Sequence, residues 1–511
     1  MLVSTVIAGL SATSISIGIG LGLLSVIISR CFYRLYWHPL AKYPGPYYAA
    51  CFSLSAAIIS VLRKEPQWIQ SLVKKYGNNT PIRIQPNLLL FPQPSALKEI
   101  YWDPKCNLKS GLYGTGALGP PHLFTTLNGD EHRELRKALA GPPWTIGSLK
   151  SKWENRFDNQ VQLLVKKLRE KAKAKESVVL SDKVAEFAAD IMTMISFTNP
   201  FGFVKNGRDE RHILRNWREG LDFFGFMGRF KFFQTHIITL PGLAARLLPK
   251  LTDDAGMGWL MAEADKQVSQ RELEMSKGIV KEIPDFLQHC LDARMNGEPL
   301  NPLQKRAHVT LLIQAGADTT GTALGSTLRF LITNPGKLQK AQEEIETAEA
   351  AGLLSTPVKY EEVRQHLPFF VACIKESLRL NPPATNLFGR VIGAEGKRID
   401  GFFIPPGTEV TSHAYIVQRH PELYGPDPDT FRPERWLASD KKANELDSVS
   451  FVFGMGPRVC LGKDIAIMEL YKLLPELVRR FEFDLVKTGE YVVAGGVAYN
   501  KNFIVKVNVR D

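Results

Sequence analysis

The chain begins with an uninterrupted apolar segment. Residues 2–29 contain no charged side chain and are rich in Ile, Leu, Val and Gly. About 20 helical residues span a bilayer, whereas a cleaved signal peptide would need a basic start and a shorter apolar core. A buried core helix is the alternative, but the terminal position and the lack of charge favour a transmembrane anchor over residues 1–29. Arg30, Arg34 and Lys42 follow and no Lys or Arg precedes, which places the remaining chain on the cytoplasmic side of the membrane.

The segment after the anchor has a different pattern. Residues 37–46, "WHPLAKYPGP", contain three prolines, which block a helix and fix the backbone. We therefore expect a basic, Pro-rich linker over residues 30–50. No Pro/Gly/Ser-rich break divides the chain beyond it, so residues 51–511 are expected to form one large domain.

The pattern of apolar positions in that domain is mainly helical. It has helical periodicity from about residue 129 to 352, and residues 301–333 keep that period for about nine turns. The stretches "TPIRIQPNLLLFPQP" and "KRIDGFFIPPGTEVTS" predict hairpins, and "YVVAGGVAYNKNFIVKVNV" predicts strands. The expected fold class is mainly α with small β-sheets.

Composition narrows the classes of partner. The chain is 44% hydrophobic, carries a net charge of +12 and has six cysteines without a CxxC pair. Scattered cysteines argue against a zinc site or a disulfide framework. The basic excess suits an anionic membrane surface or an acidic protein, and no long Lys/Arg run or nucleic-acid motif is present, so we expect no nucleic-acid partner.

The segment "FVFGMGPRVCLG", residues 451–462, contains the strongest chemical signal. A thiolate at Cys460 is a soft ligand for iron, and backbone N–H groups together with a helix N-terminus lower the pKa of a thiol. Gly454 and Gly456 permit the turn, Gly462 permits close approach of a planar macrocycle, and Arg458 is placed to pair with a carboxylate of that macrocycle. The alternative is a buried structural cysteine in a Gly-rich loop.

Two further motifs stand out. "KESLR" places Glu376 and Arg379 three residues apart on one helix face, where a solvated ion pair is the ordinary interpretation. "QAGADTTG" places Asp318 and Thr319 in mid-helix, where both residue types compete for backbone hydrogen bonds. A carboxylic acid and a hydroxyl together can supply protons to reduced dioxygen, and a water-filled helix kink is the alternative.

Taken together, these motifs resemble the cytochrome P-450 heme-thiolate monooxygenases. "FGMGPRVCLG" matches the cysteine-loop signature of the family at Phe453, Gly454, Gly456, Arg458, Cys460 and Gly462. The likeness extends from the linker almost to the C-terminus and is greatest to fungal microsomal enzymes of the pisatin demethylase type, many of which act in secondary metabolism.

The resemblance assigns roles to particular residues. It implies a cytochrome P-450 fold, heme b with iron ligated by Cys460, and a Glu376–Arg379–Arg435 set that locks the core behind the heme. It makes Asp318 and Thr319 the catalytic proton relay. "GDEHRELRKAL" resembles the segment along the heme edge, with His132 where Trp is common. The residues implied to bind the cofactor are His132, Arg136, Arg390, Phe453, Gly456, Arg458, Cys460 and Gly462.

The resemblance also implies a reaction and its partners. We expect an endoplasmic-reticulum enzyme that uses O2 and NADPH-derived electrons, delivered by a reductase or by cytochrome b5, to hydroxylate or O-demethylate an apolar small molecule. Arg133 and Lys137 are candidates for reductase docking. The expected pocket walls are residues 112–126, residues 223–233, Val497 and the run Asn386, Leu387 and Phe388. Alternatives are a heme-thiolate isomerase or dehydratase that needs no external electrons, and a non-enzymatic heme sensor.

Overall fold

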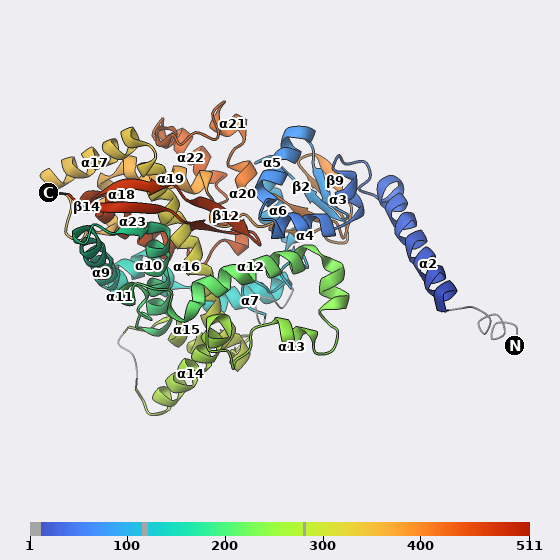
Figure 1. Cartoon of the computed structure of the whole chain (residues 1–511), viewed down its shortest axis with the longest axis horizontal. Helices are drawn as coiled ribbons and strands as arrows, with labels where there is room; N and C mark the ends of the chain where they lie inside the picture. The colour runs from blue at the N-terminus through green and yellow to red at the C-terminus, as the bar shows by residue number, and fades with distance from the viewer. Residues whose placement is uncertain (1–11, 115–120, 280–282, 511) are drawn as a thin grey trace, which may run out of the picture.

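Helices make up most of the structure, as the sequence predicts. The computed structural model describes residues 12–114, 121–279 and 283–510, and Figure 1 shows a mainly helical body with small sheets. The helices of seven or more residues are α2 (Ala12–Phe32), α4 (Leu54–Val61), α5 (Glu65–Tyr76), α7 (Gly129–Leu139), α9 (Glu154–Lys173), α10 (Leu180–Phe197), α12 (Ile213–Arg229), α14 (Gly256–Ser276), α15 (Phe286–Asp292), α16 (Pro302–Ile332), α17 (Pro335–Ala350), α18 (Tyr360–His366), α19 (Pro368–Leu380), α22 (Asp440–Ser448) and α23 (Lys463–Arg480).

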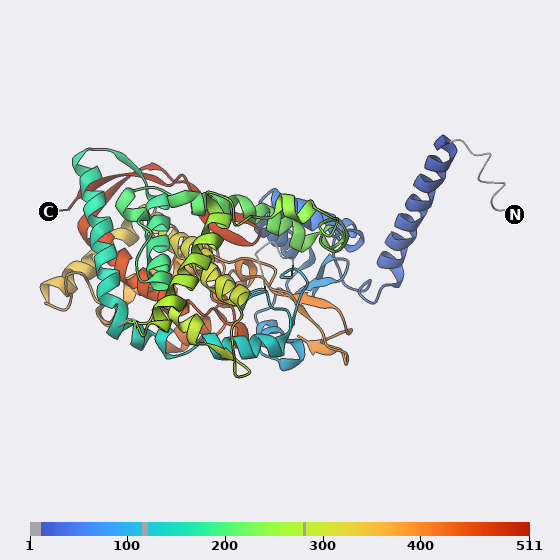
Figure 2. The same cartoon turned by 90° about the horizontal axis from the view of Figure 1, so that it is seen from below.

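The N-terminal helix stands apart from the body. Helix α2 projects from one side of the molecule (Figures 1 and 2). The helical segment Ser16–Trp37 is long and apolar enough to cross a membrane, and its hydrophobic core window is not buried inside the protein. Leu21, for example, is 61% exposed. Exposed apolar side chains over this length suit a lipid environment better than water. Residues 1–11 of the expected anchor lie outside the described residues.

The linker is non-helical in its centre. A π-helical turn, Tyr33–Trp37, continues α2, residues 38–46 form turns and extended backbone, and the short helix α3 (Tyr47–Cys51) follows. Arg83 reaches back to this region, because its Nη1 donates to the carbonyl of Arg34 at 2.7 Å. A direct hydrogen bond therefore joins the body to the π-helical turn that follows α2.

Helix α16 crosses the body, with the bounds that the sequence predicts. Asn301 caps its N-terminus in a capping box with Gln304, and it ends before Thr333. It packs against α10, α14, α19 and α23. A Cβ at Gly321 would lie 2.8 Å from the Cα of Ala185, so glycine permits the close approach of α10. This rigid element presents Thr319 to the interior of the protein.

Five small sheets complete the described fold. Ile82 pairs with Leu90 in an antiparallel hairpin, and Val410 pairs in parallel with Leu89, giving one sheet in the order β1-β2-β10-β7-β3. The predicted hairpin at residues 80–94 and the C-terminal strands are present, and of the hairpin predicted over 397–412 the part 397–404 forms β8 and β9, while β10 (Glu409–Thr411) pairs with β2 and β7. The strands are β1 (Ile82–Gln85), β2 (Leu88–Leu90), β3 (Leu108–Lys109), β4 (Ser177–Val179), β5 (Arg294–Met295), β6 (Glu298–Pro299), β7 (Arg390–Val391), β8 (Lys397–Ile399), β9 (Phe402–Ile404), β10 (Glu409–Thr411), β11 (Phe481–Lys487), β12 (Glu490–Ala494), β13 (Val497–Lys501) and β14 (Ile504–Val509).

A buried ion cluster joins α19 to the segment that precedes the cysteine loop. Arg379 donates from Nε and Nη2 to the two carboxylate oxygens of Glu376, each at 2.8 Å, and Arg435 Nε donates to Glu376 Oε1 at 2.9 Å. Trp436 occupies the position where the family commonly has Phe, and its indole Nε1 donates to Glu376 Oε2 at 2.9 Å. Trp at this position therefore adds a fourth side-chain hydrogen bond to the buried carboxylate of Glu376.

This geometry predicts the effect of restoring the common family residue. Trp436→Phe removes an N–H donor from a buried carboxylate, so the free energy of unfolding should fall by about 1.5–3 kcal/mol. Thermal unfolding followed by fluorescence would measure the loss. Trp102→Phe is the control, because Trp102 is 58% exposed and its replacement should change stability by about 0.5 kcal/mol or less. Equal destabilisation by the two variants would contradict the assigned role of the indole.

Candidate active site

A large cavity lies between α16, α12, α7 and the cysteine loop. It contains about 2010 Å³ of space outside protein atoms, including its opening to solvent. Leu123, Phe124, Phe224, Ala315 and Val497 give it an apolar and aromatic lining. An apolar chamber with a few polar groups is typical of small-molecule sites, so the structure places the sequence-predicted residues around a cavity able to take an organic ligand.

Cys460 faces this cavity. Its backbone N–H donates to the carbonyl of Phe453 at 2.8 Å, which closes the loop. Its sulfur accepts a hydrogen bond from the backbone N–H of Gly462, and α23 begins at Lys463. Burial raises the pKa of the Cys460 thiol, while the Gly462 N–H and the charges of Arg136 and Lys463 oppose that rise. The local groups act in the predicted direction, and a coordinated metal ion is what fully deprotonates such a thiol.

Two glycines give the cysteine loop its shape, and a third leaves space beside the sulfur. Gly454 and Gly456 have φ of 70° and 72°, in the region that favours glycine. A Cβ at Gly456 would lie 2.1 Å from the carbonyl oxygen of Tyr101, so this position also has no room for a side chain. A Cβ at Gly462 would meet only the Cys460 sulfur, at 4.0 Å. Glycine at 462 thus keeps the cavity beside the sulfur free.

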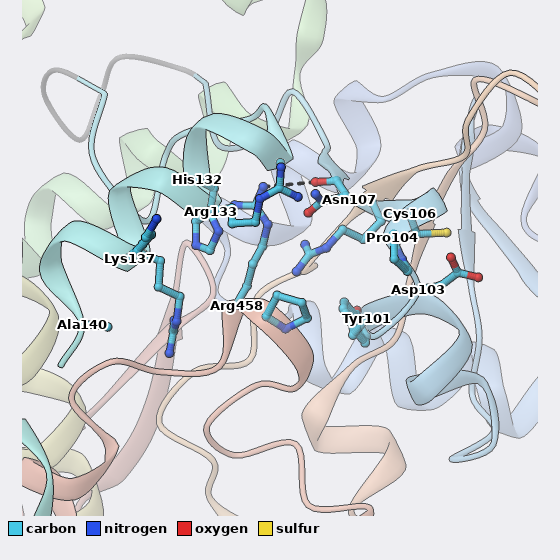
Figure 3. A pocket seen from close by; sticks show the side chains of 14 residues that line it. Tyr101, Asp103, Pro104, Cys106, Asn107, His132, Arg133, Lys137, Ala140 and Arg458 are labelled. Atoms are coloured by element: carbon cyan, nitrogen blue, oxygen red, sulfur yellow. Dashed lines mark hydrogen bonds between the residues drawn. The ribbon is translucent and has the colours of Figure 1, made fainter. Parts of the chain in front are cut away.

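Basic side chains gather at one end of the cavity. This end adjoins a second pocket, which contains about 900 Å³ of space outside protein atoms, open solvent included. In the described structure their recorded hydrogen bonds go to backbone carbonyls: Arg458 donates to Asn107 at 3.1 Å and Arg136 to Val459 at 2.6 Å. Figure 3 shows His132, Arg133 and Lys137 on α7 near Arg458. The basic residues that line the larger cavity are Lys109, His132, Arg136, Arg390 and Arg458.

These positive groups have no acidic counterpart in the cavity lining. Burial, followed by the charges of Arg458, Lys109, Arg136 and Arg390, lowers the pKa of His132 to about 3. Burial and its cationic neighbours also lower the pKa of Lys109. Among the described lining residues, the only carboxyl side chain is that of Glu469, and burial raises its pKa well above the usual range. The cavity end therefore favours a ligand with more than one negative charge.

These features fit a heme. The cavity offers a soft sulfur ligand at Cys460, an open space beside that sulfur at Gly462, and a basic end suited to two propionates. Lys109 was not predicted as part of this end. It is a lone lysine in "NLKSGLYG", where the sequence carries no periodic or motif signal for a buried ammonium group.

The Asp318–Thr319 pair lies on the α16 wall. Thr319 lines the cavity, and its hydroxyl donates to the carbonyl of Ala315 at 2.6 Å. Asp318 is buried behind it and forms a bidentate ion pair with Arg218 of α12, at 2.7 Å from Nη2 to Oδ1. Arg218 Nη1 lies 3.9 Å from Asp182, whose side chain is half exposed. Asp182 and Arg218 thus connect the buried Asp318 to the surface, while Thr319, the next residue of α16, faces the cavity.

The substrate-facing walls match the prediction in part. Tyr113, Leu123 and Phe124 line the cavity from the predicted segment 112–126, of which residues 115–120 lie outside the described residues. Asn386 and Phe388 line it as predicted. Leu387, expected beside them, instead packs in the cluster around Ile69, because alternate residues of an extended segment point to opposite sides. The α12 contribution also begins earlier than predicted, at Trp217 and Leu221.

Comparison with known proteins establishes the family. The cytochrome P450 family matches residues 60–492. Cytochrome P450 monooxygenase aba1 of Botryotinia fuckeliana is 30% identical over 482 residues, covering 92% of each chain. Monooxygenase gsfF of Penicillium aethiopicum is 29% identical over 506 residues, covering 96% of this chain and 97% of its own, and esdpH of Penicillium shearii is 30% identical over 510, covering 96% and 98%. The chain therefore belongs to the cytochrome P450 family and is a monooxygenase, which implies a heme-thiolate cofactor.

The two cysteine-loop glycines provide a matched pair of variants. Gly454→Ala should cost about 1–3 kcal/mol through backbone strain, because φ at this position is 70°. It adds no clash, because its Cβ would meet nothing closer than 3.8 Å. Gly456→Ala adds the same strain and a clash with Tyr101, so it should cost about 1–3 kcal/mol more. Thermal midpoints and heme absorbance per protein would measure both. Equal losses in the two variants would contradict the close contact at Gly456.

Proposed function

We propose that this chain is a membrane-anchored heme-thiolate monooxygenase that hydroxylates or O-demethylates an apolar small molecule. The observation that carries the proposal is the Cys460 sulfur, which opens onto an apolar cavity whose α16 wall carries Thr319. Cys460 would hold the iron of heme b through its sulfur, and the chemistry that the bound group would supply is activation of O2 and insertion of one oxygen atom into a C–H bond.

The basic end of the cavity orients the cofactor. Arg136, Arg390, Arg458 and His132 are proposed to hold the propionates by charge-assisted hydrogen bonds, with Lys109 as a further cation. Gly456 and Phe453 shape the loop, and Gly462 keeps the ring face clear. Glu376, Arg379 and Arg435 are proposed to keep the core behind this loop fixed, which is consistent with their burial.

Protons are proposed to reach the reacting oxygen through Asp318 and Thr319. Monooxygenation releases one oxygen atom as water, so two protons and two electrons are consumed for each product. The Thr319 hydroxyl can exchange its bond to Ala315 for a cavity water and pass on a proton. Asp318 is paired with Arg218, which leads toward solvent through Asp182, and opening of this ion pair would free the carboxylate to carry a proton. This arrangement supports a gated supply of protons rather than an open channel to water.

Electrons are proposed to come from NADPH through a separate flavoprotein reductase, with cytochrome b5 as an alternative donor. P450 monooxygenases in general need a reductase partner, and the exposed face of α7 offers Arg133 and Lys137 beside the basic opening (Figure 3). A basic face suits an acidic partner. The alternative functions, a heme-thiolate isomerase or dehydratase and a heme sensor, would need no such electron donor.

The chain is proposed to sit in the endoplasmic-reticulum membrane with residues 1–29 as anchor, 30–50 as linker and 51–511 as the cytoplasmic catalytic domain. Exposed apolar side chains near the linker support membrane contact, among them Tyr47, Tyr48 and Phe52. The fungal relatives support a role in secondary metabolism, and the resemblance to the pisatin demethylase type that the sequence suggests is the reason for proposing an aromatic methyl ether as one substrate.

Product formation tests the proposal. A yeast host carrying this chain and a matching reductase would be fed aromatic methyl ethers, terpenes and polyketides. The masses of the products would be measured by mass spectrometry. We expect gain of one oxygen or loss of one CH2 unit, abolished by Cys460→Ala. Cys373→Ala is the control, because Cys373 is buried on α19 away from the cavity lining. Equal activity of Cys460→Ala and the wild type would contradict the proposal.

Proton delivery has a separate signature. Thr319→Ala should lower the product formed per NADPH by about tenfold or more, since the reduced oxygen would be lost without substrate oxidation. Asp318→Asn should also lower the product formed per NADPH, while the heme spectrum stays unchanged. NADPH oxidation and product would be measured in the same assay with reductase. Unchanged coupling in both variants would exclude these residues from the relay.

A further inference from the structure

One hydrogen-bond donor in the cavity is built into a rigid frame and has no protein partner. Asn386 follows α19 and lines the cavity, while the whole residue is only 3% exposed. Its Oδ1 accepts a hydrogen bond from Arg229 Nη2 at 3.3 Å. No hydrogen bond from its Nδ2 to another described residue is present, and Nδ2 is not among the enclosed unpartnered atoms. The amide N–H group therefore faces the cavity.

Arg229 fixes the direction of this amide. Its Nε and Nη2 donate to the carboxylate of Glu65, the latter at 2.6 Å, and its Nη1 donates to the carbonyl of Gly225 at 3.2 Å. Arg229 and Glu65 are both buried. Because a guanidinium has donors only, rotating the Asn386 amide by 180° would bring donor against donor. The orientation that presents Nδ2 to the cavity is the favoured one.

The backbone around Asn386 is held equally firmly. Thr385 donates its N–H to the carbonyl of Gly496 at 2.8 Å, in the turn between β12 and β13. Gly496 has φ of 86°, and a Cβ there would lie 2.6 Å from the Cα of Asn386. Trp217 of α12 and Val497 of β13 pack against the same small apolar cluster around Leu221, and the unpartnered indole Nε1 of Trp217 is enclosed by protein. The Asn386 amide is thus held by contacts of both its backbone and its side chain.

Several other polar side chains on the walls have partners, whereas the Tyr113 hydroxyl and the Glu469 carboxyl are enclosed without one. Thr319 donates to Ala315, Lys109 donates to the carbonyl of Phe124, and His308 Nε2 accepts from the backbone of Leu123 at 3.1 Å. A buried donor without a partner is costly unless water or a ligand supplies an acceptor. An asparagine held in this way offers a fixed point of attachment for a ligand oxygen.

We propose that Asn386 anchors the substrate by donating a hydrogen bond from Nδ2 to a carbonyl or ether oxygen. The substrate class is then an apolar compound with an acceptor oxygen seated at the β12–β13 end of the cavity, and Arg229 with Glu65 positions the donor. This inference rests on the proposed function, because it assigns the ligand of the same cavity. It adds a specificity-determining residue and a chemical requirement that the apolar lining alone does not give.

Matched ligands test the proposal. Heme-loaded full-length protein would be titrated with fluorenone and fluorene, and with anthrone and 9,10-dihydroanthracene, following the ligand-induced change of the heme spectrum. The members of each pair differ by a carbonyl in place of a CH2 group. We expect the ketones to bind about five- to tenfold more tightly, as one hydrogen bond allows.

Two variants isolate the donor. Asn386→Leu should make the dissociation constants of each pair equal, and Asn386→Asp, which keeps the shape and the contact with Arg229 but removes the N–H donor, should abolish or reverse the preference. Val497→Leu, at the same end but without a polar group, should shift both members of a pair alike.

The outcomes separate this inference from the proposed function. A preference for ketones that survives in both Asn386 variants overturns the inference, as does binding of the hydrocarbons equally well, or of neither member of any pair, by the wild type. Loss of the thiolate-type carbon monoxide spectrum in the wild type would instead overturn the proposed function, since that spectrum does not depend on Asn386.

Discussion

The structure depends most on positive charge held in its interior without acidic partners. Lys109, Arg136, Arg390 and Arg458 line one end of the cavity beside the neutral imidazole of His132, and the single carboxyl in the described lining, Glu469, has a pKa that burial raises well above its usual range. Like charges in a region of low dielectric destabilise one another. A ligand with two carboxylates removes that repulsion, so cofactor binding and stability of this region are linked.

The rest of the fold keeps the sulfur and this basic end in fixed relation. Gly456 lets the cysteine loop lie against Tyr101, the Glu376 cluster holds the segment before the loop, and α16 brings Thr319 to the same cavity. Each contact is specific to a small area, yet together they join elements far apart in the sequence. Helix α12 contacts two further residues of the site, because its Arg218 donates to Asp318 and its Arg229 donates to Asn386.

The sequence predicted what local pattern and motif can encode. The bounds of α16 follow from helical periodicity over residues 301–333, and the cysteine loop from its glycines and Cys460. It could not predict contacts that arise only when distant elements meet. Nothing near Asp318 indicates Arg218, nothing near Asn386 indicates Arg229, and Lys109 has no motif around it. Leu387 was misplaced because the alternation of an extended segment has a phase that its neighbours, not its own sequence, determine.

The central claim is that Cys460 is the axial ligand of a heme at this site. The most direct measurement is the carbon monoxide spectrum of the reduced, heme-loaded full-length protein, compared with that of Cys460→His. The account predicts a thiolate-type spectrum for the wild type and its replacement by an imidazole-type spectrum in the variant, with heme retained. A thiolate-type spectrum that persists in Cys460→His, or its absence from properly folded, heme-loaded wild type, would contradict the account.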